Sequence, residues 1–191
     1  MQILRATDFR TMPWKNGGGE TTEIAVSPPG ASMEDFDWRV SMARVASNGP
    51  FSLFPGIDRS LTLLEGAGMT LDIASRGAHH LTIRSAPLAF PGDVAVQSCL
   101  DDGPILDLNV MTRRGVCQAV VERLEGAETV LLADRATLLL LVRGGGAMAG
   151  THSLADGDAL LLEPGHPAVP FRCAPEVTVF RIAISPAQQV R

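Results

Sequence analysis

The sequence predicts an all-β protein made of two small antiparallel β-barrels, and three features of the chain support this fold class. Glycine occurs 19 times and proline 13 times in 191 residues, so the chain is divided into short segments. Several of these segments alternate apolar and polar residues, for example 36–42 and 69–73, as half-buried strands do. Similar segments also recur in the two halves. Many short, turn-bounded strands are typical of β-sandwiches and barrels.

The first elements follow from local sequence signals. One short helix is expected near residues 6–11, and the first barrel strand is expected at 21–26. Between them, the segment 13–21 reads PWKNGGGET, with three consecutive glycines. Consecutive glycines allow the chain to bend sharply into a strand, because glycine adopts backbone angles that other residues avoid.

A loose internal repeat organises the remaining elements. Three features occur twice in the same order: a strand with a glycine turn, a Gly-Asp turn with a strand, and an apolar closing strand, at 61–68, 91–96 and 105–111 and again at 139–146, 156–161 and 177–184. Tandem repetition of this kind predicts two similar units. We therefore expect domains at 1–115 and 116–191, and strands from the N-terminal part could complete the shorter second unit.

Composition excludes several function classes. The formal net charge is −5 and basic residues form no long run, which argues against nucleic acid as a partner. The longest apolar run, 136–142, is far too short for a membrane-spanning helix, and no apolar signal segment is visible near the start. The three cysteines lie far apart and form no CxxC motif. We therefore expect reduced thiols in a cytoplasmic protein, and the sequence leaves a homodimer open.

Four segments in a fixed order resemble one known family. They read PWKNGGGET, FDWRVSMARV, GPFSLFPGIDRSLTLLEGAGMTL and DLNVMTRRG, and together they are similar to the HutD/Ves family of bicupins. The resemblance implies two cupin-like barrels in one chain. It also implies a non-enzymatic regulator, linked to histidine utilisation, that binds a small carboxylate such as formylglutamate or urocanate. A metal-independent isomerase or epimerase acting on a small acidic substrate is the alternative, so the question of enzyme activity stays open.

The glycine-rich segment supplies the first candidate ligand-binding residues, Trp14, Lys15, Asn16, Gly17 and Gly18. It is no phosphate-binding P-loop, because the lysine precedes the glycines. The backbone N–H groups of consecutive glycines can form a concavity that accepts an anion, with a lysine charge and an amide beside it. A tight turn with a solvated lysine is the other interpretation. The family resemblance favours a loop that faces the ligand.

Two strands carry polar residues at every second position. Arg39 and Ser41 share one face of the strand at 36–45, and Asp107 and Asn109 share one face of the strand at 105–112. If these faces line a cavity, the planar guanidinium of Arg39 suits a carboxylate ligand, since it can form two parallel hydrogen bonds. If they face water, they are ordinary solvated strand faces.

Three further candidates complete the predicted ligand-binding set. Phe54 could form an apolar wall, and Arg59 follows a Pro-Gly turn, where a local ion pair with Asp58 is the alternative. Glu23 lies in the first strand after the glycines and could act as an acid or base in an enzyme, although the sequence shows no partner for it. No catalytic nucleophile motif occurs.

The histidines predict no metal site and no cofactor. Cupin metal centres use an HxH pair together with a glutamate and a further histidine. Here His79 and His80 are adjacent, so they would point to opposite faces of a strand, and His152 and His166 have no HxH partner. We expect the four histidines to lie on the surface or in loops.

Overall fold

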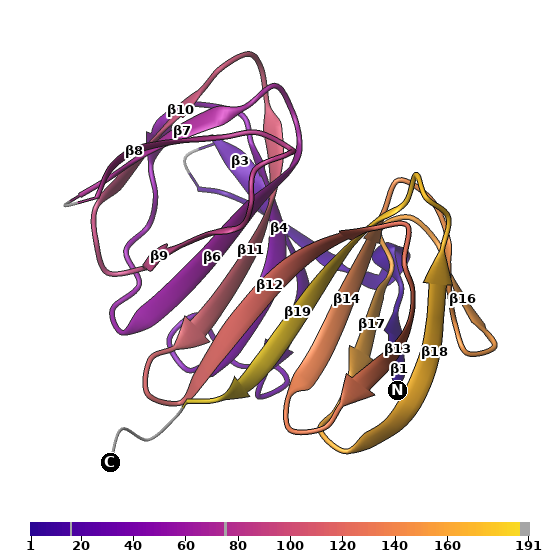
Figure 1. Cartoon of the computed structure of the whole chain (residues 1–191). Coiled ribbons are helices and arrows are strands. Elements are labelled where there is room, and N and C mark those ends of the chain that lie inside the picture. The colour runs from indigo at the N-terminus through magenta and orange to yellow at the C-terminus, as the bar shows by residue number, and fades with distance from the viewer. Residues whose placement is uncertain (16, 75, 188–191) are drawn as a thin grey trace. The chain divides into compact units, whose positions relative to one another are not determined.

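The computed structural model of the chain describes residues 1–15, 17–74 and 76–187. These residues form β-strands and a single short 3-10 turn, η1 (Ala6–Asp8), so the protein is all-β, as predicted (Figure 1). They divide into two compact units. We call Arg10–Cys117 the central unit, and Met1–Phe9 together with Gln118–Arg191 the terminal unit.

The central unit contains two antiparallel sheets. The six-stranded sheet has the strand order β2-β3-β4-β11-β6-β9, formed by Arg10–Pro13, Gly19–Ser27, Trp38–Val45, Ile105–Arg113, Ile57–Glu65 and Leu88–Pro91. The four-stranded sheet has the order β5-β10-β7-β8, formed by Gly49–Pro50, Val96–Leu100, Met69–Ile73 and Gly77–Leu81. Figure 1 shows β7, β8 and β10 as a separate layer from β4, β6 and β11.

Alternating apolar residues pack these two sheets against each other. Leu61 and Leu63 on β6 belong to the same buried cluster as Leu71 and Ile73 on β7, and all four are at most 1% exposed. Strand side chains point alternately to the two faces, so every second residue of β4, β6 and β11 faces the space between the sheets. The polar residues of those strands that share this face therefore lie inside the unit.

The terminal unit repeats this plan. Its five-stranded sheet has the order β1-β17-β14-β19-β12, formed by Gln2–Leu4, Ala159–Leu162, Thr137–Arg143, Thr178–Pro186 and Cys117–Glu125. Its four-stranded sheet has the order β13-β18-β15-β16, formed by Glu128–Ala133, His166–Cys173, Ala147–Ala149 and His152–Leu154. Leu138, Leu140 and Val142 of the first sheet share one buried cluster with Val169 and Phe171 of the second.

The beginning of the chain belongs to the terminal unit, which differs from the predicted division at 1–115 and 116–191. Strand β1 pairs with β17, with Ile3 opposite Leu160. Asp158 holds the following turn: its carboxylate accepts hydrogen bonds from Arg5 Nη1 at 2.6 Å and from the Ala6 backbone N–H at 2.9 Å. Residues 1–9 therefore supply the edge strand that the short C-terminal segment lacks.

The strand order confirms one part of the sequence repeat and corrects another. Seven consecutive strands, β5 to β11, occupy the same places in their sheets as β13 to β19. The strands and glycine turns at 61–68 and 139–146 are equivalent, and so are the two closing strands. The two Gly-Asp turns are not, because Gly92 precedes β10 whereas Gly157 precedes β17, and β17 corresponds to β9.

Two other expectations need adjustment. The helix expected near 6–11 is the single turn η1, and β2 already begins at Arg10. No sheet of the described residues closes on itself, so each unit is a two-sheet sandwich in place of a closed barrel. In the part of the chain that the structure describes, no helix has the length and apolar character needed to cross a membrane.

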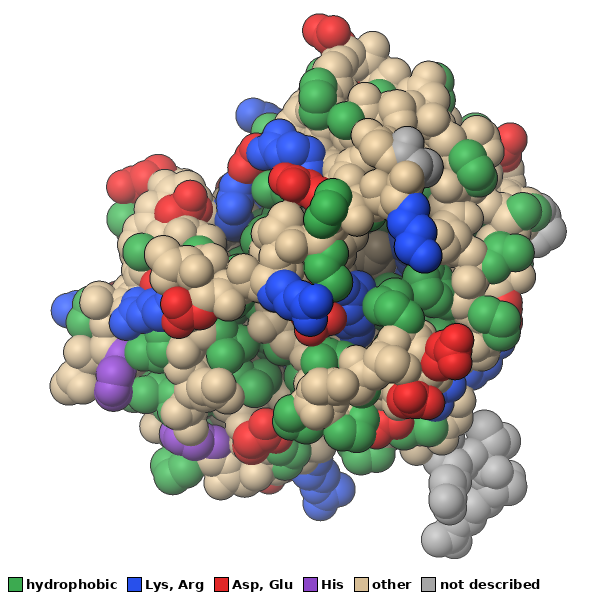
Figure 2. Space-filling view, turned by 180° about the vertical axis from the view of Figure 1, so that it is seen from behind, with side chains coloured by type: hydrophobic (Ala, Val, Ile, Leu, Met, Phe, Trp, Pro, Cys, Tyr) green, Lys and Arg blue, Asp and Glu red, His purple; other side chains and the backbone are tan. Residues whose placement is uncertain are grey.

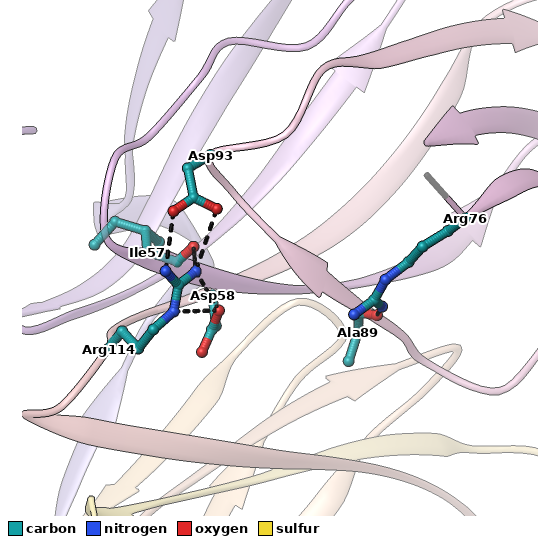
Figure 3. A network of polar contacts seen from close by, with 6 residues as sticks. All are labelled: Ile57, Asp58, Arg76, Ala89, Asp93 and Arg114. Carbon is teal, nitrogen blue, oxygen red and sulfur yellow. Dashed lines mark hydrogen bonds and ion pairs between the residues drawn. The ribbon is translucent and has the colours of Figure 1, made fainter. Parts of the chain in front are cut away.

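An ion-pair network in the central unit decides which residue pairs with Asp58. The Arg114 guanidinium lies between the carboxylates of Asp58 and Asp93, with closest distances of 2.8 and 2.9 Å, and Arg76 donates to the Ala89 carbonyl nearby (Figure 3). Asp58 therefore pairs with Arg114. The local pair with Arg59 that the sequence allowed does not form, because neighbouring residues of β6 point to opposite faces.

Candidate ligand-binding pocket

A pocket of about 580 Å³ opens in the central unit. Its lining combines apolar and charged side chains from β2, β3, β4, β5, β6 and β11 and from three connecting segments: Met12, Pro13, Trp14, Lys15, Thr21, Met33, Arg39, Ser41, Ala43, Pro50, Phe51, Ser52, Phe54, Arg59, Asp107, Asn109 and Met111. The space-filling view shows a hollow near the centre of one face, with Lys or Arg side chains and hydrophobic side chains around it (Figure 2). A pocket of this size and composition is typical of small-molecule sites.

The register of three strands brings the polar residues together. Met111 on β11 lies opposite Arg39 on β4 and opposite Arg59 on β6. Asn109 is likewise opposite Ser41. Neighbouring strands are about 4.8 Å apart, so the two arginine Cα atoms lie about 10 Å apart across Met111. The faces of 36–45 and 105–112 that carry alternate polar residues therefore line a cavity.

Arg39 is held in the pocket by its neighbours on β3 and β4. The residue is 5% exposed, its Nε donates to Glu23 Oε2 at 2.7 Å, and its Nη1 donates to Ser41 Oγ at 3.3 Å. Its Nη2 has no hydrogen-bond partner among the described residues. A buried guanidinium keeps its charge, and a charged donor without a partner is available to an anionic ligand.

Arg59 is held mainly by aromatic rings. It is 6% exposed, and its guanidinium carbon lies 4.9, 5.7 and 5.3 Å from the ring centres of Phe51, Phe54 and Phe90. Its Nε donates to Asn109 Oδ1 at 3.4 Å. Burial lowers the pKa of Arg59 to about 10, against the opposing effect of the Asp107 charge, so the side chain is still a cation at neutral pH.

Asp107 is the acidic residue of the pocket. It is 1% exposed, and its Oδ1 is buried without a hydrogen-bond partner among the described residues. Burial raises the pKa of Asp107 to about 7, although the Arg59 charge acts to lower it. A carboxyl group in such a place can donate or accept a proton near neutral pH.

The glycine-rich segment forms a turn at the rim of the pocket. The Trp14 N–H donates to the Gly19 carbonyl at 2.8 Å, and the Trp14 indole Nε1 donates to Thr21 Oγ1 at 2.8 Å. Gly17 has a φ of 71°, which residues with a side chain rarely adopt. This geometry places Trp14 and Lys15 in the lining.

The structure brings most of the predicted set together. Eight predicted residues line the pocket: Trp14, Lys15, Arg39, Ser41, Phe54, Arg59, Asp107 and Asn109. Glu23 reaches it through its ion pair with Arg39. Gly17 and Gly18 lie outside the lining and shape the turn, and Asn16 lies outside the described residues.

Sequence reasoning missed several apolar lining residues, above all Met12, Met33 and Phe51. Phe51 lies in the same GPFSLFPGIDRS segment as Phe54 and Arg59, and that shared segment was a usable signal. Met12 and Met33 sit in segments without any regular pattern, so nothing in the sequence marked them.

The histidines and cysteines of the central unit are not among the residues that line the pocket. Among the described residues, no group of three or more His, Cys, Asp or Glu side chains could hold a metal ion. His79 and His80 lie on β8, where His80 is exposed and pairs with Asp101. Burial raises the pKa of the Cys117 thiol, which makes it a poor nucleophile at neutral pH.

The distant structural neighbours define the fold. The oxalate decarboxylase of Lactobacillus farciminis is 8% identical, with a TM-score of 0.68 over 98% of this chain and 87% of that one. At this identity the likeness concerns the fold alone, and it is cupin-like.

Closer relatives define the family. A model of the HutD family matches residues 6–180. The protein Ves of Citrobacter koseri is 42% identical over 158 residues, which cover 81% of this chain and 76% of Ves. A conserved protein of unknown function from Pseudomonas aeruginosa PAO1 is 34% identical, with a TM-score of 0.85 over 96% of this chain and 98% of that one. HutD from Pseudomonas fluorescens SBW25 is 29% identical, with a TM-score of 0.81 over 98% and 99% of the two chains. The chain belongs to the HutD family.

Proposed function

We propose that the protein binds a small carboxylate metabolite in the pocket of the central unit and acts as a non-enzymatic regulator linked to histidine utilisation. The observation that carries this proposal is the pair of buried arginines, Arg39 and Arg59, on one face of the pocket. Burying a charge is costly unless a partner offsets the lost hydration. Neither guanidinium has all its donors paired by the described residues, so an anionic ligand supplies what they lack.

The charges around the pocket favour an anion. Glu23 neutralises Arg39 through their ion pair. Arg59 and Lys15 add two positive charges, and Asp107 offsets one of them when it is ionised. The unliganded pocket therefore carries a net charge between +1 and +2, depending on the protonation of Asp107. A net positive pocket lined by buried charges binds carboxylates more strongly than neutral molecules of the same size.

Formylglutamate and urocanate are the ligands we propose. Formylglutamate has two carboxylates, which could pair with the two arginines. Urocanate has one carboxylate and an aromatic ring, which could pack against Phe51 and Phe54 beside Arg59. The two arginines on separate strands favour the dicarboxylate.

A metal-independent enzyme is the second candidate, and one observation favours it. Asp107 lines the pocket and has a pKa of about 7, which suits a general acid or base. An isomerase or epimerase of a small acid needs such a group beside the reacting carbon. Conversion of a bound ligand during long incubation, followed by NMR, distinguishes this candidate from a regulator.

Isothermal titration calorimetry tests the proposal directly. We expect formylglutamate, urocanate or both to bind at one site per chain, and free histidine, a zwitterion of similar size, to bind more weakly. A ligand at about 100 times its dissociation constant should also stabilise the protein by about 2.7 kcal/mol in thermal unfolding. Absence of saturable binding by both acids at millimolar concentration would contradict the proposal.

A further inference from the structure

We propose that Asp107 binds the ligand as a carboxylic acid, so that each carboxylate entering the pocket is accompanied by one proton taken up from solvent. This inference rests on the proposed function and assigns Asp107 a specific role in it. The bond formed is a hydrogen bond from the protonated Asp107 oxygen to a carboxylate oxygen of the ligand.

Asp107 is buried in apolar surroundings within the pocket. Its side chain lines the pocket at 1% exposure, and its strand neighbours on the same face are apolar, Ala43 on β4 and Leu63 on β6. Oδ1 receives no hydrogen bond from the described residues. An ionised carboxylate normally accepts several hydrogen bonds when it is buried, so this surrounding fits the neutral acid better than the anion.

The charged groups near Asp107 determine how a ligand changes its protonation. Arg59 on β6 is the cation whose charge acts on Asp107, and the Arg39–Glu23 pair lies on β4 and β3. Lys15 lies at the rim, and His79 shares the inner face of the four-stranded sheet with Leu71. In the free protein, Arg59 is what favours ionised Asp107. A ligand carboxylate that pairs with Arg59 removes this support.

Two carboxylates at close range in a buried site do not both stay ionised. Because the ligand carboxylate is held by guanidinium groups, Asp107 is the one that takes the proton. The reaction is therefore ionised ligand plus ionised Asp107 plus one proton from solvent, giving ionised ligand hydrogen-bonded to neutral Asp107. The pKa of about 7 in the free protein means that the proton is taken up within the physiological range.

Calorimetry in buffers of different ionisation enthalpy measures this proton. Formylglutamate is the probe, because its carboxylates do not titrate near neutral pH. At about pH 7.5, the binding enthalpies in phosphate and in Tris should differ by about 0.5 to 1 times the difference between the ionisation enthalpies of the two buffers, which corresponds to about 0.5 to 1 proton taken up per ligand. Affinity should fall by up to about tenfold for each pH unit above neutrality. Equal enthalpies in both buffers, with binding intact, would overturn the inference and leave the proposed function standing.

Two variants separate Asp107 from the other carboxylate near the pocket. Asp107→Asn keeps the shape and a donor, so it should bind the probe with no proton uptake and with pH-independent affinity. Glu23→Gln changes the partner of Arg39, so its affinity changes while the proton uptake remains. Proton uptake that persists in Asp107→Asn would assign the proton to another group and contradict the inference.

A measurement on the ligand-free protein completes the test. The folded state of the wild type should hold a proton on Asp107 that the unfolded chain has released. Its stability relative to Asp107→Asn should therefore fall as pH rises from about 4 to about 7 and then level off. A difference that does not vary with pH overturns the inference. If the difference varies as expected but no carboxylate binds, the proposed function fails, and the inference fails with it.

Discussion

Arg59 keeps a positive charge in a place that removes nearly all of its water. Three phenylalanine rings surround its guanidinium, and a hydrogen bond to Asn109 fixes its direction. Cation–π contacts offset part of the lost hydration, about 0.5–2 kcal/mol for each ring, depending on its exposure. The fall of the pKa of Arg59 to about 10 reflects the part of the desolvation cost that these contacts do not offset. The residue therefore costs stability in the free protein, and the anionic ligand that we propose would restore it.

Substitution of Arg59 by methionine should separate stability from binding. Methionine has a similar length and fills the phenylalanine cage, so we expect Arg59→Met to leave the free energy of unfolding unchanged or raise it by about 1–2 kcal/mol. Asp107 can avoid an unpaired charge by protonating. Carboxylate binding should become undetectable in calorimetry. A loss of more than about 3 kcal/mol in chemical unfolding would show that the charge is part of the fold.

Substitution of Arg39 by lysine tests whether the planar guanidinium group, with its several donors, is needed for ligand binding. Lysine keeps the charge but cannot contact Glu23, Ser41 and a ligand together, so affinity should fall by about 1.5–3 kcal/mol. Arg44→Lys is the matched control, because Arg44 lies on the same strand, is half-exposed and points away from the pocket towards Glu65. Calorimetry should show no change for the control. Equal affinities for both variants would mean that Arg39 does not contact the ligand.

The residues of the pocket were predictable to different degrees for physical reasons. Period-two alternation identifies Arg39 and Ser41 as one face, but it does not say whether that face is buried. The answer depends on where β7 and β10 pack, and that packing is set by residues far along the chain. Phe51 is harder to assign from sequence, because its chemistry suits both a core and a cage for Arg59. The shortness of the second unit indicated that N-terminal strands could complete it, but no local signal identifies β17 as the partner of β1.

At the scale of elements, the glycine-rich turn shows that consecutive glycines can have different tasks. Gly17 provides a positive φ, and open space surrounds it. Gly19 permits close contact, because a Cβ at this position would overlap the Arg44 carbonyl oxygen and meet the Trp14 ring. The turn therefore delivers Trp14 and Lys15 to the pocket through backbone constraints, while the glycines themselves stay outside the lining.

Alanine substitutions of the glycines should show which backbone constraint contributes more to the free energy of unfolding. We expect Gly19→Ala to cost about 1–3 kcal/mol of unfolding free energy, because backbone atoms must shift. Gly17→Ala should cost about 1–2 kcal/mol from its left-handed backbone alone. Gly49→Ala is the control, since its Cβ would meet no atom and its backbone is ordinary. Urea unfolding measures all three. A Gly49→Ala loss as large as that of Gly19→Ala would contradict the ranking.

At the scale of the whole molecule, the two ends of the sequence build one unit. Asp158 is central to this arrangement, because it accepts hydrogen bonds from Arg5, Ala6 and Ala155. Burial alone acts to raise the pKa of Asp158, but these hydrogen bonds outweigh it and hold the pKa below its usual value. Its stabilising effect is therefore present at neutral pH and is lost on acidification below the usual aspartate range.

Removal of residues 1–9 should destabilise the terminal unit strongly. The deletion exposes the edge of β17 and leaves Asp158 without two of its donors, so we expect a loss of several kcal/mol and a clear fall of the thermal midpoint. Arg5→Ala removes the side-chain hydrogen bonds to Asp158 and to the Ser153 carbonyl, and it should cost about 1–2 kcal/mol. Differential scanning calorimetry compares them. An unchanged midpoint after deletion would mean that β1 adds nothing to the sheet.

The pairing of β1 with β17 also orders events during protein synthesis. Residues 2–4 leave the ribosome before their partner strand, and the contact between Ala6 and Asp158 spans 152 positions of sequence. At about 5–20 residues per second, the partner strand emerges about 8–30 s later. Every segment of the central unit is synthesised within that interval and has time to fold. Strand β1 therefore waits without its partner β17 until the whole central unit has been synthesised.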